Sequence, residues 1–216
     1  MANETPPARK ASFLSLTQLI SLAIIITLAA NALISSQDLA FVIFSIIYIY
    51  FLSTFAFPPF PTPPKNPPIF DPKNRILPIY VSAGAIIGLF LPLIYILQGI
   101  FSGDKERIKT AAPHLFLLAT QVYMEGVVFS DMFAIPIHVF VPVFYNSKRI
   151  FSIVEWLVTE FSIVEDADDS YVRVLFGRAL ALGNMAFWGF NLFGFLLPIY
   201  LPRAFNKYYS SSKVKD

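Results

Sequence analysis

Long blocks of apolar residues, each close to the length that crosses a lipid bilayer, constrain this chain more than any other feature of its sequence. A helix needs about 20 predominantly apolar residues to cross a hydrocarbon core about 30 Å thick. Hydrophobic residues make up 56% of the 216 residues and charged residues 14%, whereas about 25% of the residues of an ordinary soluble domain are charged. The sequence therefore predicts an all-α, polytopic transmembrane helix bundle.

The apolar blocks predict about four full spans, a re-entrant or broken helix pair and one amphipathic surface helix. The full spans are expected at 13–34, 39–57, 76–101 and 179–201. They belong to a single transmembrane domain, 13–205, between a short polar N-terminal tail, 1–12, and a polar C-terminal tail, 206–216. Residues 1–32 also resemble a cleavable signal peptide. The apolar stretch exceeds the about 7–15 residues of a signal core, which favours an uncleaved helix.

The segment 114–145 departs from a simple span. It divides at Ser130 and Asp131, and its second part carries Pro136 and Pro142. That second part, about 14 residues long, would reach only about 21 Å as a helix, which is less than the hydrocarbon thickness. We therefore expect a re-entrant or broken pair, with a single kinked span as the alternative.

Residues 147–164 separate apolar and polar side chains onto opposite faces of a helix. Ile150, Ile153 and Leu157 share the apolar face, whereas Glu155 and Thr159 share the polar face. This pattern is typical of a helix that lies along the membrane surface. A lid packed on the bundle is the alternative.

A proline-rich connector, 58–75, is the main interruption between the spans. Eight of the fifteen residues in PPFPTPPKNPPIFDP, 58–72, are proline. Such a segment favours extended polyproline II structure and acts as a stiff spacer. It also contains a P-x-x-P arrangement, Pro61 to Pro64, which is the kind of motif that docks a protein partner. The spacer is the preferred interpretation because this motif is common in proline-rich segments.

The sequence GAIIG places Gly84 and Gly88 one helical turn apart. Two glycines at this spacing allow a neighbouring helix backbone to approach closely. We expect both glycines to pack against another helix of the same chain. A homo-oligomer that pairs through this face is the alternative.

One carboxylic acid, Glu125, interrupts the apolar stretch LFLLATQVYMEGVVF, with Gln121 one turn earlier. A carboxylate that faces acyl chains at the bilayer centre is unfavourable by about 2.5–3.5 kcal/mol. We therefore expect Glu125 to point into the bundle with Gln121, near Asn184 and Asn191, as a protonated or hydrogen-bonded group. These four residues are the candidate intramembrane polar site.

Several classes of function lack support in the sequence. There is no nucleotide-binding glycine loop, no zinc-protease motif and no nucleophile elbow, so we expect no catalytic residues and no enzyme. The net charge of +2 does not indicate a nucleic-acid partner. The chain has no cysteine and only two histidines. We expect neither a metal site nor a cofactor.

Four blocks of sequence resemble a plant family of small multi-pass membrane proteins that carry a domain of unknown function. The blocks are AFVIFSIIYIYFLS (40–53), GAIIGLFLPLIYI (84–96), PVFYNSKRIF (142–151) and NMAFWGFNLFGFLLPIYLPRAF (184–205). The resemblance extends over about 13–209. It implies a plant membrane setting and supplies no activity, catalytic residue or ligand.

Two classes of function follow. A structural or partner-binding membrane component is favoured by the glycine pair, the two intramembrane asparagines and the proline-rich connector. Its partners are the lipid bilayer and, through the connector, another protein. A small transporter or an ion or proton pathway is the alternative, and it depends on Glu125 beside a broken segment.

The distribution of Lys and Arg predicts that both termini face the cytosol. With a re-entrant segment, one side carries Arg9, Lys10, Lys65, Lys73, Arg75, Arg203, Lys207, Lys213 and Lys215, and the other side carries fewer basic residues. Basic residues accumulate on the cytosolic side. Glycosylation tags at residues 3 and 213 should both report the cytosol, and tags that report opposite sides would contradict the even-numbered topology.

Overall fold

Every regular element in the described part of the chain is helical. The computed structural model describes residues 14–59, 69, 75–129, 132–163 and 171–213, with side chains to residue 210. In chain order the elements are α1 Leu16–Ala30, α2 Ser36–Phe51, η1 Leu52–Ala56, α3 Ile76–Ala85, η2 Ile86–Phe90, α4 Leu91–Ser102, α5 Lys105–Val128, α6 Ile135–Ser162, α7 Tyr171–Phe190, η3 Asn191–Tyr200 and α8 Leu201–Lys213. The η elements are π-helical turns that continue the helix before them.

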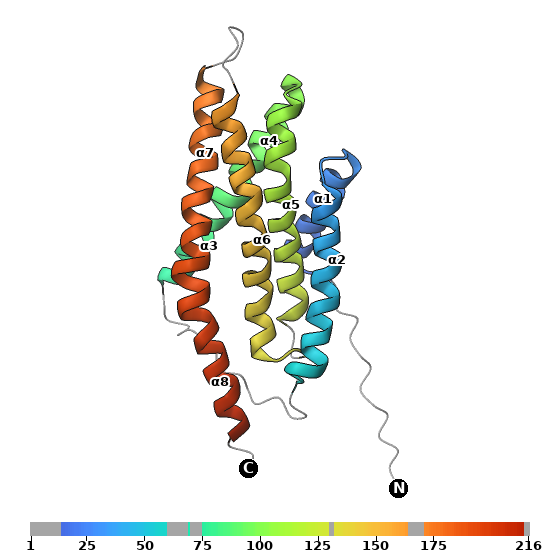
Figure 1. The fold of residues 1–216 in the computed structure, drawn as a ribbon, viewed down its shortest axis with the longest axis vertical. Helices are drawn as coiled ribbons and strands as arrows, with labels where there is room; N and C mark the ends of the chain where they lie inside the picture. The colour runs from blue at the N-terminus through green and yellow to red at the C-terminus, as the bar shows by residue number, and fades with distance from the viewer. Residues whose placement is uncertain (1–13, 60–68, 70–74, 130–131, 164–170, 214–216) are drawn as a thin grey trace.

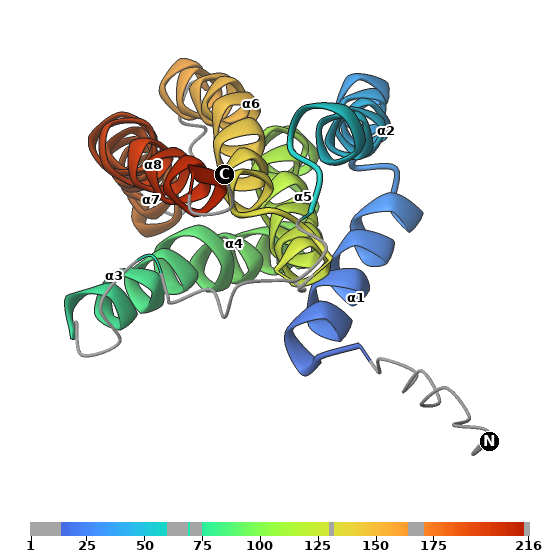
Figure 2. The same cartoon turned by 90° about the horizontal axis from the view of Figure 1, so that it is seen from below.

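The helices form an upright bundle with α5 and α6 at its centre (Figures 1 and 2). α5 packs against α1, α4 and α6, whereas α6 packs against α5, α7 and α8. The main core is made by buried residues of these helices, among them Leu115, Leu117, Tyr145 and Trp156. The two central helices are therefore the frame on which the outer helices are placed.

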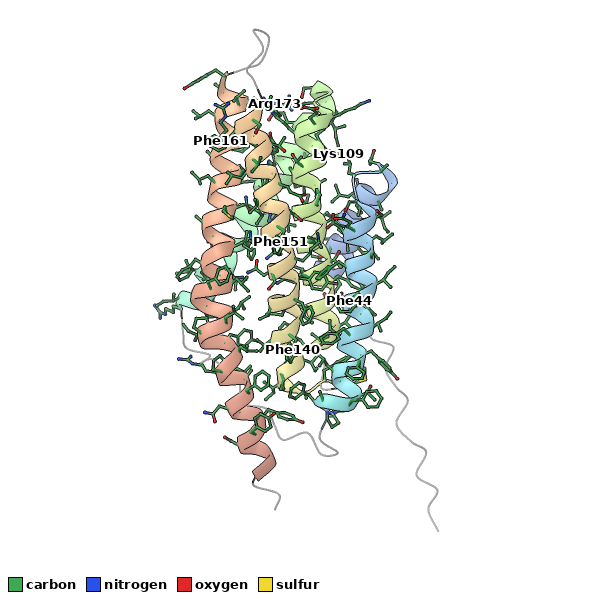
Figure 3. All side chains as sticks on the ribbon, viewed as in Figure 1. Phe44, Lys109, Phe140, Phe151, Phe161 and Arg173 are labelled. Carbon is green, nitrogen blue, oxygen red and sulfur yellow. The ribbon has the colours of Figure 1, made fainter. Side chains whose placement is uncertain are left out.

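The outer helices present apolar side chains away from the core. Exposed examples are Phe44 on α2, Ile79 on α3 and Phe193 in η3. In Figure 3, Phe44 and Phe151 lie along the side of the bundle, while Lys109 and Arg173 lie towards one end. An apolar side and charged ends are what a bilayer requires of a spanning bundle.

Three helices in the described residues are long and apolar enough to cross a membrane: Ser36–Ala56, Ile76–Ser102 and Tyr171–Ser210. This number is smaller than the about four full spans expected from the sequence. The span expected at 13–34 is helical over only 15 residues in α1, because the chain turns at Ala32, which has a φ of 53°. α5 and α6 are longer, but their charged side chains make them less apolar.

The expected re-entrant or broken pair at 114–145 is instead the lower half of a long antiparallel hairpin. α5 begins at Lys105 and runs for 24 residues, and α6 runs for 28 residues. The Asp104 side chain accepts the N–H of Arg107 at 3.3 Å and caps α5 at its first turn. Pro136 lies in the first turn of α6, where no N–H donor is needed. Both helices are therefore longer than the breakers suggested.

The amphipathic surface helix expected at 147–164 does not exist as a separate element. Residues up to Ser162 are the second half of α6. Glu155 is exposed, as expected, but Trp156 and Glu160 are buried inside the bundle. The polar face was predicted from Glu155 and Thr159, and Glu160 was not considered. The segment therefore has a second polar position, Glu160, on the side that packs into the bundle.

Ion pairing and capping position α2 against α6. Ser35 caps α2 by accepting the N–H of Asp38 at 3.1 Å, which confirms the cap expected from the sequence. The Asp38 carboxylate also lies 3.0 Å from Nζ of Lys148. Further along α2, the hydroxyls of Ser45 and Tyr145 are hydrogen-bonded at 2.8 Å. The α1–α2 hairpin is thus held to the centre by polar as well as apolar contacts.

The structure places the glycine pair against α7. A Cβ on Gly84 would lie 3.2 Å from the ring of Phe187, and a Cβ on Gly88 would lie 2.5 Å from the indole of Trp188. Real Cβ atoms do not approach so closely, so the indole occupies the space that Gly88 leaves. Within the chain, the pair lets a bulky aromatic side chain sit directly on α3 and η2.

Gly88→Ala should therefore destabilise the fold by about 1–3 kcal/mol, the usual effect of overpacking. Gly183 is the matched control, because a Cβ there meets nothing within 4 Å. Gly183→Ala should be neutral, or stabilising by up to about 1 kcal/mol through helix propensity. Thermal unfolding midpoints in detergent measure both changes. Equal midpoints for the two variants would contradict the close packing of Trp188.

Candidate functional site

A row of polar residues follows the contact between the two central helices. On α5 these residues are Asp104, Arg107, His114, Gln121 and Glu125, at intervals of three, four or seven. Residues at these intervals share one face of a helix. Because α6 runs antiparallel to α5 (Figure 1), Gln121 meets Arg149 and Arg107 meets Glu160. The row therefore contains two clusters of charge, one towards each end.

The first cluster is organised by Arg149, whose side chain is 0% exposed. Its Nη1 donates to Oε1 of Gln121 at 2.8 Å, and its Nη2 donates to Oδ1 of Asn146 at 3.0 Å. Nε2 of Gln121 in turn donates to Oε1 of Glu125 at 2.8 Å. Gln121 therefore bridges a buried cation and a half-buried acid, and each of its amide atoms has a partner.

Trp188 of α7 completes the surroundings of Arg149. The guanidinium carbon lies 3.9 Å from the centre of the indole ring, which is a cation–π contact. Nδ2 of Asn146 donates to the Trp188 carbonyl at 3.2 Å, and Nε1 of Trp188 donates to Oδ1 of Asn184 at 3.1 Å. One cation thus connects α5, α6 and α7.

Pro92 explains two further contacts in this region. A proline has no N–H, so the carbonyl four residues earlier, that of Gly88, loses its helical donor. Nε2 of His114 lies 3.0 Å from this oxygen, and Nδ2 of Asn184 donates to the Ile87 carbonyl at 3.0 Å. The π-helical turn before Pro92 thereby becomes an acceptor for side chains of α5 and α7.

His114 is fully buried. Its ring lies 5.9 Å from that of Trp156 and 6.4 Å from that of Trp188. Since Nε2 donates to a carbonyl, Nδ1 is left as an acceptor, and within the described residues this atom has no hydrogen-bond partner. The described residues also contain no group of three His, Cys, Asp or Glu side chains able to hold a metal ion.

The second cluster surrounds Glu160, whose side chain is also 0% exposed. Its Oε1 accepts the hydroxyl of Tyr95, and accepts Nε1 of Trp156 at 3.0 Å. Its Oε2 lies 3.7 Å from Nε of Arg107. Gly177 leaves the necessary room, because a Cβ there would lie 2.6 Å from Oε2 of Glu160.

Asp104 extends this cluster to α7. Its Oδ2 lies 3.2 Å from Nη1 of Arg107 and 3.1 Å from Nη2 of Arg173. Arg178 donates from Nε to the Glu160 carbonyl at 3.1 Å. The second cluster consequently connects four helices. These are α5, α6, α7 and, by way of Tyr95, α4.

A cleft of about 550 Å³ opens beside the first cluster. Its walls come from α3, α5 and η3, and most of them are apolar; Tyr80, Leu89, Leu118 and Phe195 are among the lining residues. Gln121, Glu125 and Asn191 also line it. Tyr80 donates its hydroxyl to Oδ1 of Asn191 at 2.7 Å. The cleft therefore has an apolar body and one wall with hydrogen-bonding groups.

The four predicted site residues separate into two groups. Gln121, Glu125 and Asn191 line the cleft. Asn184 instead accepts a hydrogen bond from Trp188 and donates one to the Ile87 carbonyl. Glu125 lies in the last turn of α5 and not at mid-helix, because α5 ends at Val128. Sequence reasoning missed Arg149, Arg107 and Glu160. For Arg107 a signal was available in the sequence. Its spacing from His114, Gln121 and Glu125 places all four residues on one helical face.

Buried Glu160 and exposed Glu155 offer a matched pair on α6. Removal of Glu160 leaves the Arg107 guanidinium without its buried counter-charge, so Glu160→Ala should cost about 3–5 kcal/mol. Glu155→Ala should change stability by at most about 0.5 kcal/mol. Unfolding midpoints in detergent distinguish them. Glu160→Gln retains the acceptor for Tyr95 and Trp156 and should fall between the two; a midpoint for Glu160→Ala equal to that of Glu155→Ala would contradict the ion pair.

Comparison with protein families gives one match. The family model described as a domain of unknown function (DUF7733) matches residues 14–209. This confirms a domain of unknown function over nearly the expected extent; the plant setting and the membrane character of the family stay predictions. Comparisons with curated proteins and with solved structures gave no match.

Proposed function

The chain belongs to the family of the domain of unknown function DUF7733, and we propose that it is a multi-pass integral membrane protein that binds a lipid-like molecule from the bilayer. The binding place is the cleft between α3, α5 and η3. The protein acts in this role as a binding component and not as an enzyme. The observation that carries the proposal is the combination of an apolar cleft with the polar wall of Gln121, Glu125 and Asn191.

The form of the cleft supports binding. Ligand sites are usually concave and mostly apolar, with a few placed polar groups, and occupy about 300–1,000 Å³. The cleft meets each of these conditions at about 550 Å³. The apolar side chains around it belong to outer helices such as α3, which exposes Ile76, Ile79 and Val81. A molecule dissolved in the bilayer therefore has an apolar route to the cleft.

The positions of the two ends of the described chain support the membrane setting. Gln18, at the start of α1, lies against Gly126, near the end of α5, and Ala204 of α8 packs with Ile135 at the start of α6. The described beginning and end of the chain thus share one end of the bundle, as an even number of crossings requires. Lys148 and Arg149 lie within α6 and not in a loop on the opposite side. Without these two residues the opposite side has fewer Lys and Arg, so the excess on the side proposed to be cytosolic is larger.

A proton or ion pathway is the second candidate. It is favoured by the polar row between α5 and α6, in which Nδ1 of His114 and Nε of Arg149 have no hydrogen-bond partner within the described residues. Buried polar atoms of this kind commonly bind water. Two buried arginines in the row oppose passage of a proton or a cation, since fixed positive charge raises the electrostatic barrier. Binding is therefore the preferred function.

Filling the cleft tests the binding function. Ala85 lines the cleft, while Ala83, which is equally half-buried on the same helix, does not. Native mass spectrometry of protein released from nanodiscs should show a retained lipid on the unmodified protein and on Ala83→Trp, and loss of that lipid from Ala85→Trp. Equal retention by the two variants would contradict binding in this cleft.

Substitution of Glu125 separates binding from conduction. Glu125→Gln keeps the shape and the bond with Gln121 but removes titration, so it should fold normally and show no change in proton flux into proteoliposomes. Glu125→Leu should destabilise the fold by about 1–3 kcal/mol, because Gln121 loses its acceptor. A flux that depends on pH in the unmodified protein and disappears in Glu125→Gln would favour the pathway instead.

A further inference from the structure

We propose that the cleft selects lipids whose polar head is a hydroxyl group, and rejects lipids with a carboxylate or phosphate head. This inference rests on the proposed binding function and adds the chemical class of the ligand. It follows from the hydrogen-bonding groups that remain available on the polar wall once the contacts within the protein are made.

Glu125 supplies an acceptor. A carboxylate has two oxygens and about four lone-pair sites. The hydrogen bond that the structure shows to this carboxylate comes from Nε2 of Gln121 to Oε1. The Gln121 carbonyl is already used by Arg149 at 2.8 Å. A ligand in the cleft therefore meets a half-buried carboxylate with acceptor sites to spare, and the ligand must bring a donor.

Asn191 supplies a donor. Its side chain is 6% exposed, and its Oδ1 accepts the hydroxyl of Tyr80 at 2.7 Å. Within the described residues, its Nδ2 donates no hydrogen bond to another protein atom. A buried amide without a partner is unfavourable. A ligand that brings an acceptor to this position is consequently stabilised by Asn191.

A hydroxyl head both donates and accepts without charge. A carboxylate or phosphate head accepts only, and it would face the Glu125 carboxylate in a site with little water, where like charges cost several kcal/mol. An ammonium head donates only, so it satisfies Glu125 and leaves Asn191 without an acceptor. Buried Arg149 does not contact an anionic head directly, because it is not among the residues that line the cleft.

The apolar body of the cleft fits a hydrocarbon skeleton. Tyr80 is central to it, with ring centroids 5.1 Å from Phe187 and 5.6 Å from Phe195. Leu89, Leu118 and Leu196 add aliphatic surface. The polar wall lies near the end of α5, whereas Leu118 lies about two turns closer to the middle of that helix. A lipid alcohol would thus place its head near the membrane surface and its chain along the helices.

Three lipids of one chain length test the selection, because they differ in their heads alone. Radiolabelled octadecanol is bound to the purified full-length protein in detergent, and unlabelled octadecanol, octadecanoic acid and octadecylamine compete for it. We expect octadecanol to displace the label at a concentration at least tenfold lower than the acid. The amine should lie between them. An acid or an amine that competes as well as the alcohol would overturn the proposal.

Two substitutions test whether the polar wall of the cleft causes the preference for a hydroxyl head. Glu125→Gln removes the negative charge and adds a donor, so the preference for the alcohol over the acid should fall at least tenfold. Asn191→Leu should weaken binding of the alcohol at least fivefold, whereas Asn206→Leu, exposed on α8, should leave it unchanged. Unfolding midpoints show that each variant is folded. A preference unchanged in Glu125→Gln would overturn the role of the carboxylate.

The outcomes also separate this inference from the binding function. If none of the three lipids binds while native mass spectrometry still shows a retained lipid that Ala85→Trp removes, the binding function holds and the selection for a hydroxyl head is wrong. If no lipid is retained at all, the binding function itself fails.

Discussion

The buried guanidinium of Arg149 is the constraint on which the centre of the bundle depends. A cation with no exposure to water must find its solvation in the protein, and three helices supply it: Gln121 on α5, Asn146 on α6 and the indole of Trp188 on α7. Loss of one partner leaves a buried charge, which is more costly than loss of an ordinary hydrogen bond. The relative positions of α5, α6 and α7 are therefore specified by charge as well as by shape.

Breaks in helical hydrogen bonding supply the remaining polar contacts. Pro92 removes the donor for the Gly88 carbonyl, and the π-helical turn before it also leaves the Ile87 carbonyl accessible; His114 and Asn184 bond to these oxygens. The Trp188 carbonyl, just before the π-helical turn at Asn191, is similarly bonded by Asn146. In a bilayer such carbonyls find no water, so side chains on neighbouring helices must reach them. Irregular backbone and buried amides thus depend on each other here.

The sequence predicted the helical class and the glycine pair, but it predicted only part of the polar row. Apolar blocks predict helices because their length and composition are local properties, and Gly84 and Gly88 indicate a close contact without naming the partner. Arg149 and Glu160 were absent from the predicted polar site, because an amphipathic pattern does not distinguish a buried charged residue from an exposed one. Their burial depends on partners 28 residues away at Gln121 and 65 residues away at Tyr95. Tertiary pairing of that kind leaves no mark in local periodicity.

The depth of Glu125 connects the fold to the proposed ligand. Because α5 begins at Lys105 and ends at Val128, Glu125 lies one turn from the end of its helix and not at its middle. Gln121 connects it to the buried Arg149. A carboxylate placed at the centre would have favoured a pathway, since a translocated ion needs sites along its whole route. One acid at the end of a helix, beside a sideways cleft with apolar walls, favours recognition of a head group.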